Sequence, residues 1–212
     1  GEEVRRTKTV NGRGVRRGRL REKVENGQYR QMVLRDVLAK DQYLSRQERA
    51  FITRVSEGTL EQLIEIDYIL DQFSKVKVKK MKPVIRNLLR SAVYQPKYMD
   101  SVPDRAVCSE SVKLAVKKGF SGLRGYVNGV LRSVARGMDE IRYPEKGTRA
   151  LSVRYSCPEW IIELWTQSFD EDVVETMLAS SLRVKPVTTR CCLNRPAPEA
   201  LPGVLQTEGG NA

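Results

Sequence analysis

The sequence predicts a mainly α-helical protein, in which a helical bundle is followed by the beginning of a truncated α/β subdomain. Apolar residues recur at helical spacing almost without a break from residue 28 to about residue 137. A turn-rich stretch at 142–147 then marks the best domain boundary. The one convincing strand, at 185–193, is short and rich in β-branched residues, and one strand cannot make a finished sheet.

Three parts are therefore expected along the chain: a basic arm over 1–22, an all-helical domain over 23–140, and a linker with an incomplete subdomain over 141–212. Residues 1–21 hold seven arginines and one lysine against two glutamates. The arginines alternate with glycines, and such a composition cannot bury a core. The arm either neutralises phosphates or is a solvated terminus, and the sequence favours neither interpretation.

The first helices of the bundle are predicted from their apolar stripes and start signals. Residues 28–40 carry the first stripe. Ser45 is followed three residues later by Glu48, which is the signature of a capping box at a helix start. We expect Gly58 to interrupt the helix that begins there, and helical spacing to resume over 59–73.

Proline and glycine mark the limits of the later helices. Pro83 and Pro103 each precede an apolar stripe, and proline suits the first helical position because its missing N–H would have no partner there. Gly119 is expected to end the second of these helices, and 122–136 forms the last helix of the bundle. Beyond the boundary, helices are expected over 158–169 and 170–182.

The charge balance points to a polyanionic partner. Lys and Arg number 38 against 26 Asp and Glu, which gives a formal net charge of +12. Such an excess is most often found in proteins that bind nucleic acid and less often in proteins that bind anionic membrane surfaces. Aromatic residues that could stack on bases are few, which favours recognition of RNA shape and backbone over the reading of single bases.

Two clusters of cations are the candidate contacts with RNA. Lys79, Lys82 and Arg86 are spaced so that they share one helical face with Arg90, and the preceding loop adds three more lysines. A solvated basic face is the ordinary explanation for such a run, but the net charge favours phosphate contact. The candidate RNA-binding residues are Lys75, Lys77, Lys79, Lys80, Lys82, Arg86, Arg90, Lys117, Lys118, Arg124, Asn128 and Arg132.

Several kinds of site are excluded or unsupported. The chain has no histidine, which removes histidine-based triads, general bases and zinc ligands. Its four cysteines form no C-x-x-C pair, and free thiols in a basic chain suggest a reducing cytoplasm. No stretch approaches the roughly 18 apolar residues of a membrane span. We expect a cytoplasmic protein that binds no membrane and no metal.

The order of eight short segments carries a resemblance to a known family. They are DQYL at 41–44, RAFI at 49–52, GTLE at 58–61, MKPVIR at 81–86, LLR at 88–90, YMDSVP at 98–103, GYVNGVLR at 125–132 and LSVRYSCPEW at 151–160. Over residues 28–212 the chain resembles the N-terminal part of the bacterial 16S rRNA cytosine-C5 methyltransferases called RsmB, Sun or Fmu. No single segment is specific, whereas their order and spacing together are.

The resemblance implies a NusB-like helical domain that binds RNA, followed by the start of the subdomain that leads into a methyltransferase core. It also implies that the parent protein uses S-adenosylmethionine and that its partner is 16S rRNA. Separately, we expect a monomer, although the sequence does not determine the oligomeric state. The family's catalytic cysteines and glycine-rich cofactor loop belong to a later region. We therefore expect no catalytic or cofactor-binding residue in this chain, and no activity from it alone. Residues 1–22 depart from the family's apolar first helix.

Two residues within these motifs have expected roles. Asn128 could contact RNA, although capping or bridging of helices is the ordinary alternative. Trp160 is expected to be a core anchor between the two domains. A stand-alone NusB-like module in transcription antitermination or ribosome assembly is the alternative function, and a bundle that binds protein instead of RNA is a third reading.

Overall fold

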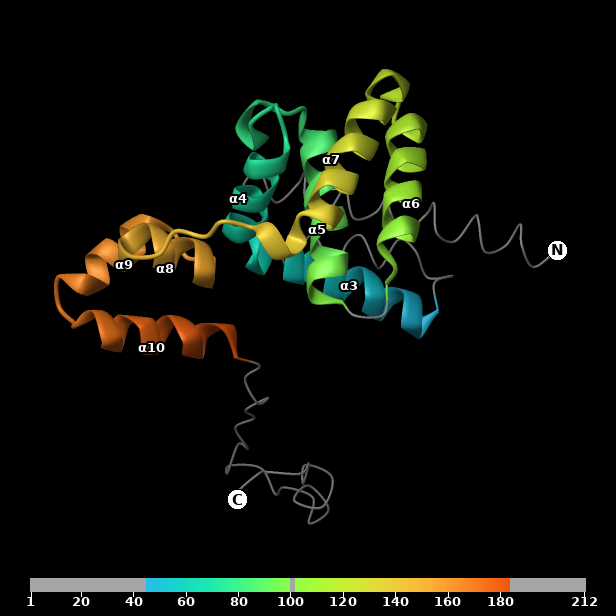
Figure 1. Ribbon diagram of the computed structural model, residues 1–212. Helices are drawn as coiled ribbons and strands as arrows, with labels where there is room; N and C mark the ends of the chain where they lie inside the picture. The colour runs from blue at the N-terminus through green and yellow to red at the C-terminus, as the bar shows by residue number, and fades with distance from the viewer. Residues whose placement is uncertain (1–44, 100–101, 184–212) are drawn as a thin grey trace, which may run out of the picture.

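The computed structural model describes residues 45–99 and 102–183, and Figure 1 shows their arrangement. The predicted basic arm, the predicted helix over 28–40 and the predicted strand over 185–193 lie outside the described residues. The domain limits predicted at residues 22, 140 and 212 stay predictions.

The described part of the chain is helical, which confirms the predicted mainly α class. Its α-helices are α3 (Arg46–Glu61), α4 (Leu63–Phe73), α5 (Pro83–Tyr98), α6 (Asp104–Lys117), α7 (Arg124–Arg136), α8 (Gly147–Tyr155), α9 (Glu159–Thr166) and α10 (Glu171–Leu182). Short 3-10 turns are η1 (Val78–Lys80), η2 (Ser121–Leu123) and η3 (Met138–Glu140).

Helix α5 is the centre of the bundle, packed among α3, α4, α6 and α7. Its residues from Asn87 to Gln95 are all buried, so it has almost no solvent face in its middle. Ile85 and Leu89 meet fully buried side chains such as Ile66 and Val127 in one continuous core. Burial of this kind stabilises a fold by roughly 1.5–3 kcal/mol per large apolar side chain.

Local signals place the ends of several helices as predicted. The Glu48 backbone N–H donates to Ser45 Oγ at 3.2 Å, and the Ser45 N–H donates to Glu48 Oε2 at 2.9 Å, so the capping box is confirmed. Pro83 is the first residue of α5, also as predicted. Gly119 ends α6 with φ +83, while the Phe120 N–H bonds to the Ala115 carbonyl, as in a Schellman motif.

The predicted break at Gly58 is wrong, because α3 continues through it to Glu61. Gly58 is buried, and a Cβ placed on it would collide with the ring and hydroxyl of Tyr94 on α5. The glycine therefore allows two helices to approach closely. The chain turns instead at Gln62, whose N–H bonds to the Gly58 carbonyl.

Helices α8, α9 and α10 form a second, smaller cluster beside α4. Its buried side chains are Leu151, Ile162, Val174 and Leu178. The expectation that Trp160 is a core anchor is wrong, since its side chain is 65% exposed. Trp160 lies about 200° around the helix from Ile162, and Ile162 is the α9 residue that faces the core.

Candidate nucleic-acid interface

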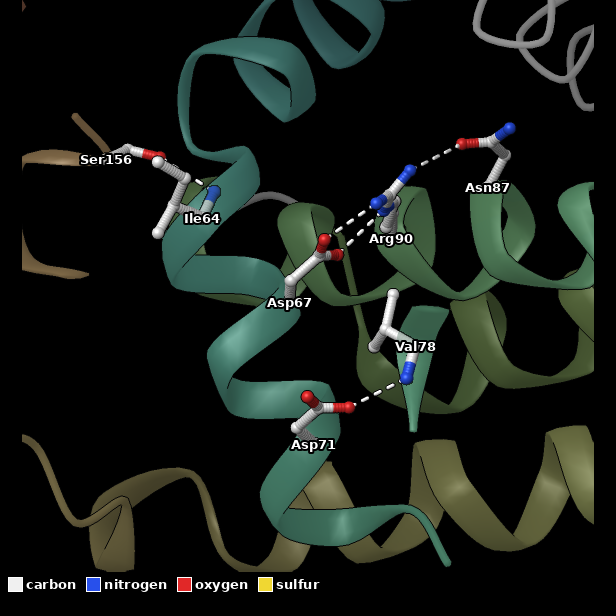
Figure 2. A network of polar contacts seen from close by, with 7 residues as sticks. All are labelled: Ile64, Asp67, Asp71, Val78, Asn87, Arg90 and Ser156. Carbon is white, nitrogen blue, oxygen red and sulfur yellow. Dashed lines mark hydrogen bonds and ion pairs between the residues drawn. The ribbon is translucent and has the colours of Figure 1, made fainter. Parts of the chain in front are cut away.

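The connection between α4 and α5 carries five lysines, and we call residues 74–82 the lysine loop. Val78 and Met81 are buried and anchor it to the core. Asp71 Oδ1 accepts the Val78 backbone N–H at 2.7 Å, as Figure 2 shows. Ser74 Oγ donates to the Val76 carbonyl at 2.7 Å. These contacts fix the loop backbone, while the lysines of the loop are exposed.

The lysines of the loop are available to an anion. Lys75, Lys79 and Lys80 are exposed. Lys77 Nζ donates to the Asp71 backbone carbonyl at 3.1 Å, and Lys82 Nζ lies 5.4 Å from the centre of the Phe120 ring. No carboxylate in the described ranges forms an ion pair with any of the five. Uncompensated cations on a fixed backbone favour phosphate binding, because little conformational entropy is lost.

The structure gives Arg90 a different role from the one predicted. Its side chain is 8% exposed, and its Nε and Nη2 donate to the two carboxylate oxygens of Asp67 on α4, at 2.7 and 2.6 Å. Its Nη1 donates to Asn87 Oδ1 at 3.2 Å (Figure 2). The interpretation of Arg90 as part of an exposed basic face is therefore wrong, because this guanidinium ties α5 to α4. Arg86, one turn earlier, is half-buried.

The second predicted cluster lies on the hairpin of α6 and α7, which run side by side in opposite directions (Figure 1). A groove of about 720 Å³ is lined by residues of both helices, and we call it the hairpin groove. Its α7 wall carries Arg124, Asn128 and Arg132, which are successive residues of one helical face. Lys117 and Lys118 end α6 at the turn of the hairpin and are not part of the groove lining.

The opposite wall of the hairpin groove was not predicted. Arg105, Ser109 and Lys113 line it from α6 with the same spacing of four residues. That spacing was visible in the sequence, and the turn at Gly119 implies that the two helices are antiparallel neighbours. The groove therefore has cations on both walls, at both ends.

Asn128 bridges the two helices at the floor of the groove. The Cys108 thiol lies 3.6 Å from Asn128 Oδ1, within reach of a weak hydrogen bond. Burial raises the pKa of Cys108, with Asp104 adding to the effect and Arg132 opposing it. Burial likewise raises the pKa of Cys157. Both groups are therefore held as thiols, which is unfavourable for a nucleophile. Cys191 and Cys192 lie outside the described residues.

A partly buried polar cluster joins the bundle to the segment that leads to α8. Glu65 on α4 accepts from Tyr98, from the Tyr143 hydroxyl at 2.8 Å and from Lys97 Nζ at 3.2 Å. Lys97 also donates to the Tyr143 hydroxyl at 3.0 Å. Burial lowers the pKa of Lys97, but its bonds to Tyr143 and Glu65 outweigh this and raise it. Burial and the bond to Glu65 raise the pKa of Tyr98. These contacts indicate a structural role, in which the cluster holds the segment before α8 against the bundle.

Neither a metal centre nor a membrane segment is found in the part of the chain that the structure describes. Across 45–99 and 102–183, no three His, Cys, Asp or Glu side chains gather as metal ligands would. None of the described helices combines the length and the apolar character that a membrane crossing requires.

Comparison with known proteins supports the interpretation of the fold. The family model described as the NusB family matches residues 16–136. A Bacillus subtilis protein named "Probable ribosomal RNA small subunit methyltransferase B" is 36% identical over 152 residues, which is 71% of this chain and 34% of that protein. This chain thus spans only about a third of the length of that relative.

Stand-alone proteins are similar as well. "Transcription antitermination protein NusB" of Dictyoglomus thermophilum is 30% identical over 132 residues, which is 62% of this chain and 92% of that protein. The crystal structure of NusB from T. maritima superposes with a TM-score of 0.54 at 20% identity, over 60% of this chain and 90% of that one. The structural likeness shows a shared fold.

Proposed function

Because this chain belongs to the NusB family, we propose that its helical bundle binds structured ribosomal RNA and that the lysine loop supplies the main phosphate contacts. The lysine loop carries the proposal: its cations have no carboxylate partners among the described residues, and buried anchors fix its backbone. Phosphate contacts supply most of the sequence-independent affinity for RNA, and they position the protein on the RNA.

The parent protein is proposed to be an S-adenosylmethionine-dependent methyltransferase that modifies cytosine C5 in 16S rRNA. The name of the Bacillus subtilis relative supports methyl transfer to small-subunit ribosomal RNA. The cytosine-C5 position and the 16S target rest on the resemblance of the sequence motifs alone. Within that protein, the bundle would position the RNA for a catalytic domain, and this chain alone would be inactive.

The described residues do not fit S-adenosylmethionine. A nucleotide-like cofactor of this kind is usually held where a glycine-rich loop follows a strand and opens a helix. Residues 45–99 and 102–183 contain only helices, 3-10 turns and the loops between them. No catalytic step is therefore assigned to these residues, and we expect a calorimetric titration of this chain with the cofactor to show no binding. Heat that saturates at a stoichiometric ratio of cofactor to protein would contradict this expectation.

A stand-alone NusB-like module is the second candidate, since the Dictyoglomus thermophilum NusB protein is matched over 92% of its length. Helices α8–α10 distinguish the two candidates. They follow the last residue matched by the family model and build their own small core. A purified full-length protein that transfers a methyl group to small-subunit RNA would support the methyltransferase parent over the module.

Binding of an RNA hairpin as a function of salt tests the proposal. The logarithm of affinity should fall linearly with the logarithm of salt concentration, with a slope of about 0.7–0.9 per phosphate neutralised. The double variant Lys79→Glu, Lys80→Glu should weaken binding and lower that slope. The matched control is Arg142→Glu, Lys146→Glu, which makes the same charge change at exposed residues outside both basic surfaces. Equal loss in both variants, or an affinity that salt does not change, would refute the role of the lysine loop.

A further inference from the structure

The hairpin groove differs from the lysine loop in shape and in chemistry. The lysine loop is a connection between helices whose lysines are exposed, whereas the groove is a hollow lined by residues of two helices. Cys108, Val112 and Leu131 give it an apolar floor, and Ser109 and Asn128 add neutral polar groups. Its volume of about 720 Å³ lies within the range of roughly 300–1,000 Å³ that is typical of ligand pockets.

The charges of the groove are arranged in two opposed pairs. Because α6 and α7 are antiparallel, Arg105 near the start of α6 lies at the same end as Arg132 near the end of α7. Lys113 and Arg124 share the other end. The two cations on each helix are eight residues apart, so the two ends of the groove are separated by about 12 Å along the helix axes.

Most of this positive charge is uncompensated. No carboxylate in the described part of the chain pairs with Arg105, Arg124 or Arg132. Lys113 forms an exposed ion pair with Glu110 at 3.1 Å, which contributes little. Asp104 is the one acid among the lining residues, against four cations. The groove therefore attracts an elongated anion that also has apolar surface.

We propose that the hairpin groove holds an unpaired segment of the RNA, with its phosphates on Arg105, Arg124 and Arg132 and its bases against the apolar floor. This inference rests on the proposed RNA-binding function and names a second site for it. A duplex presents its phosphates on a wide outer surface, which the exposed lysines of the lysine loop can reach. A single strand can enter a groove between packed helices, and its unstacked bases can lie on arginine guanidinium planes as well as on aromatic rings.

The two basic surfaces lie at neighbouring places on the bundle. Lys82 of the lysine loop sits over Phe120, which lies in the turn between α6 and α7. One RNA could thus place a helix on the loop and the adjoining unpaired strand in the groove. The site then selects a junction between paired and unpaired RNA.

Charge reversal is the first test. The full chain would be titrated with a short, unstructured uridine oligonucleotide and, separately, with an RNA hairpin. The variant Arg124→Glu, Arg132→Glu should lower affinity for the oligonucleotide at least about tenfold, and should lower its salt slope by about 0.7 for each phosphate that is no longer neutralised. The lysine-loop variant Lys79→Glu, Lys80→Glu should instead affect the hairpin more. The control variant Arg142→Glu, Lys146→Glu should change neither the affinity for the oligonucleotide nor the affinity for the hairpin.

A neutral substitution tests the shape of the groove without changing charge. Gly125 lines the groove, and a Cβ there would meet no atom within 4 Å, so Gly125→Gln fills the groove without a clash. Gly129, one turn later, is equally open but lies outside the lining, so Gly129→Gln is the matched control. Both substitutions remove a helical glycine and should stabilise α7 slightly. Only Gly125→Gln should weaken binding of the oligonucleotide.

The outcomes separate the inference from the function it rests on. If the wild-type chain binds neither RNA, the proposed function fails. If hairpin binding depends on the lysine loop while Arg124→Glu, Arg132→Glu and Gly125→Gln bind the oligonucleotide as the wild type does, the groove proposal alone fails. It also fails if poly-glutamate of matched charge displaces the oligonucleotide as well as RNA does, because the groove would then be a site for acidic polypeptide.

Discussion

Ser156 caps a helix from which it is separated by 92 positions in the sequence: its Oγ accepts the backbone N–H of Ile64 at 2.9 Å (Figure 2). Ile64 lies in the first turn of α4, where Gln62 provides no side-chain cap. Ser156 ends α8 with φ 51 and ψ 36, in the left-handed region. The second cluster is therefore fixed to the bundle by satisfying an otherwise unpaired helix N–H.

Removal of this cap should destabilise the protein. We expect Ser156→Ala to lower the free energy of unfolding by about 1 kcal/mol, because the α4 N–H loses its acceptor. Ser156→Gly should cost less, since glycine adopts a positive φ without strain. Urea denaturation measures both. Ser168→Ala, at an exposed serine in the turn before α10, is the control. A loss as large in Ser168→Ala would contradict the role of the cap.

Loss of the Arg90–Asp67 pair should lower the stability of the protein and leave its affinity for RNA unchanged. Arg90→Lys cannot reproduce the two-pronged contact with Asp67, so we expect a loss of about 2–3 kcal/mol, less than for a fully buried pair because Asp67 is partly exposed. Affinity for RNA, measured at a temperature where the variant is folded, should stay unchanged. A weakened RNA complex together with unaltered stability would restore Arg90 to the RNA-binding surface.

Local sequence predicted the elements whose signals are local. The capping box at Ser45, the start at Pro83 and the end at Gly119 depend on residues within one or two helical turns, and the structure has them in place. The prediction of a helix break at Gly58 and the prediction of an exposed Arg90 were wrong for the same reason. Their roles depend on Tyr94 and Asp67, which lie on other helices, and helical spacing carries no information about a partner across a helix interface.

The candidate site was predictable in part. The lysine loop was visible as a cluster of cations before a proline-led helix, but its buried anchor Val78 and the bond from Val78 to Asp71 required the fold. The α7 wall of the hairpin groove was found, while Arg105 and Lys113 were missed, although their spacing was in the sequence. The packing of two antiparallel helices is what turns these two helical faces into one groove.

The close approach at Gly58 gives a prediction opposite to helix propensity. Alanine is more favourable than glycine by about 1 kcal/mol within a helix, yet Gly58→Ala should destabilise the protein by roughly 1–3 kcal/mol, because the new methyl group collides with Tyr94. Gly129→Ala, at an open position on α7, should stabilise it. The double variant Gly58→Ala, Tyr94→Leu should lose less than the two single losses combined, since the smaller side chain relieves the collision.

The polar cluster around Glu65 should make stability fall at alkaline pH. The pKa values of Lys97, Tyr98 and Tyr143 are all raised in the folded protein, so the folded state retains protons that the unfolded chain releases. The stabilisation is fully present below the unfolded pKa values of about 10 and is lost as the pH rises beyond them.

At neutral pH, Tyr143→Phe should cost about 1 kcal/mol, because the phenyl ring cannot bond to Glu65 and Lys97. Above pH ~10 it should lose stability less steeply than the wild type. Denaturant midpoints measured across this range test the coupling, which parallel curves for the wild type and Tyr143→Phe would contradict.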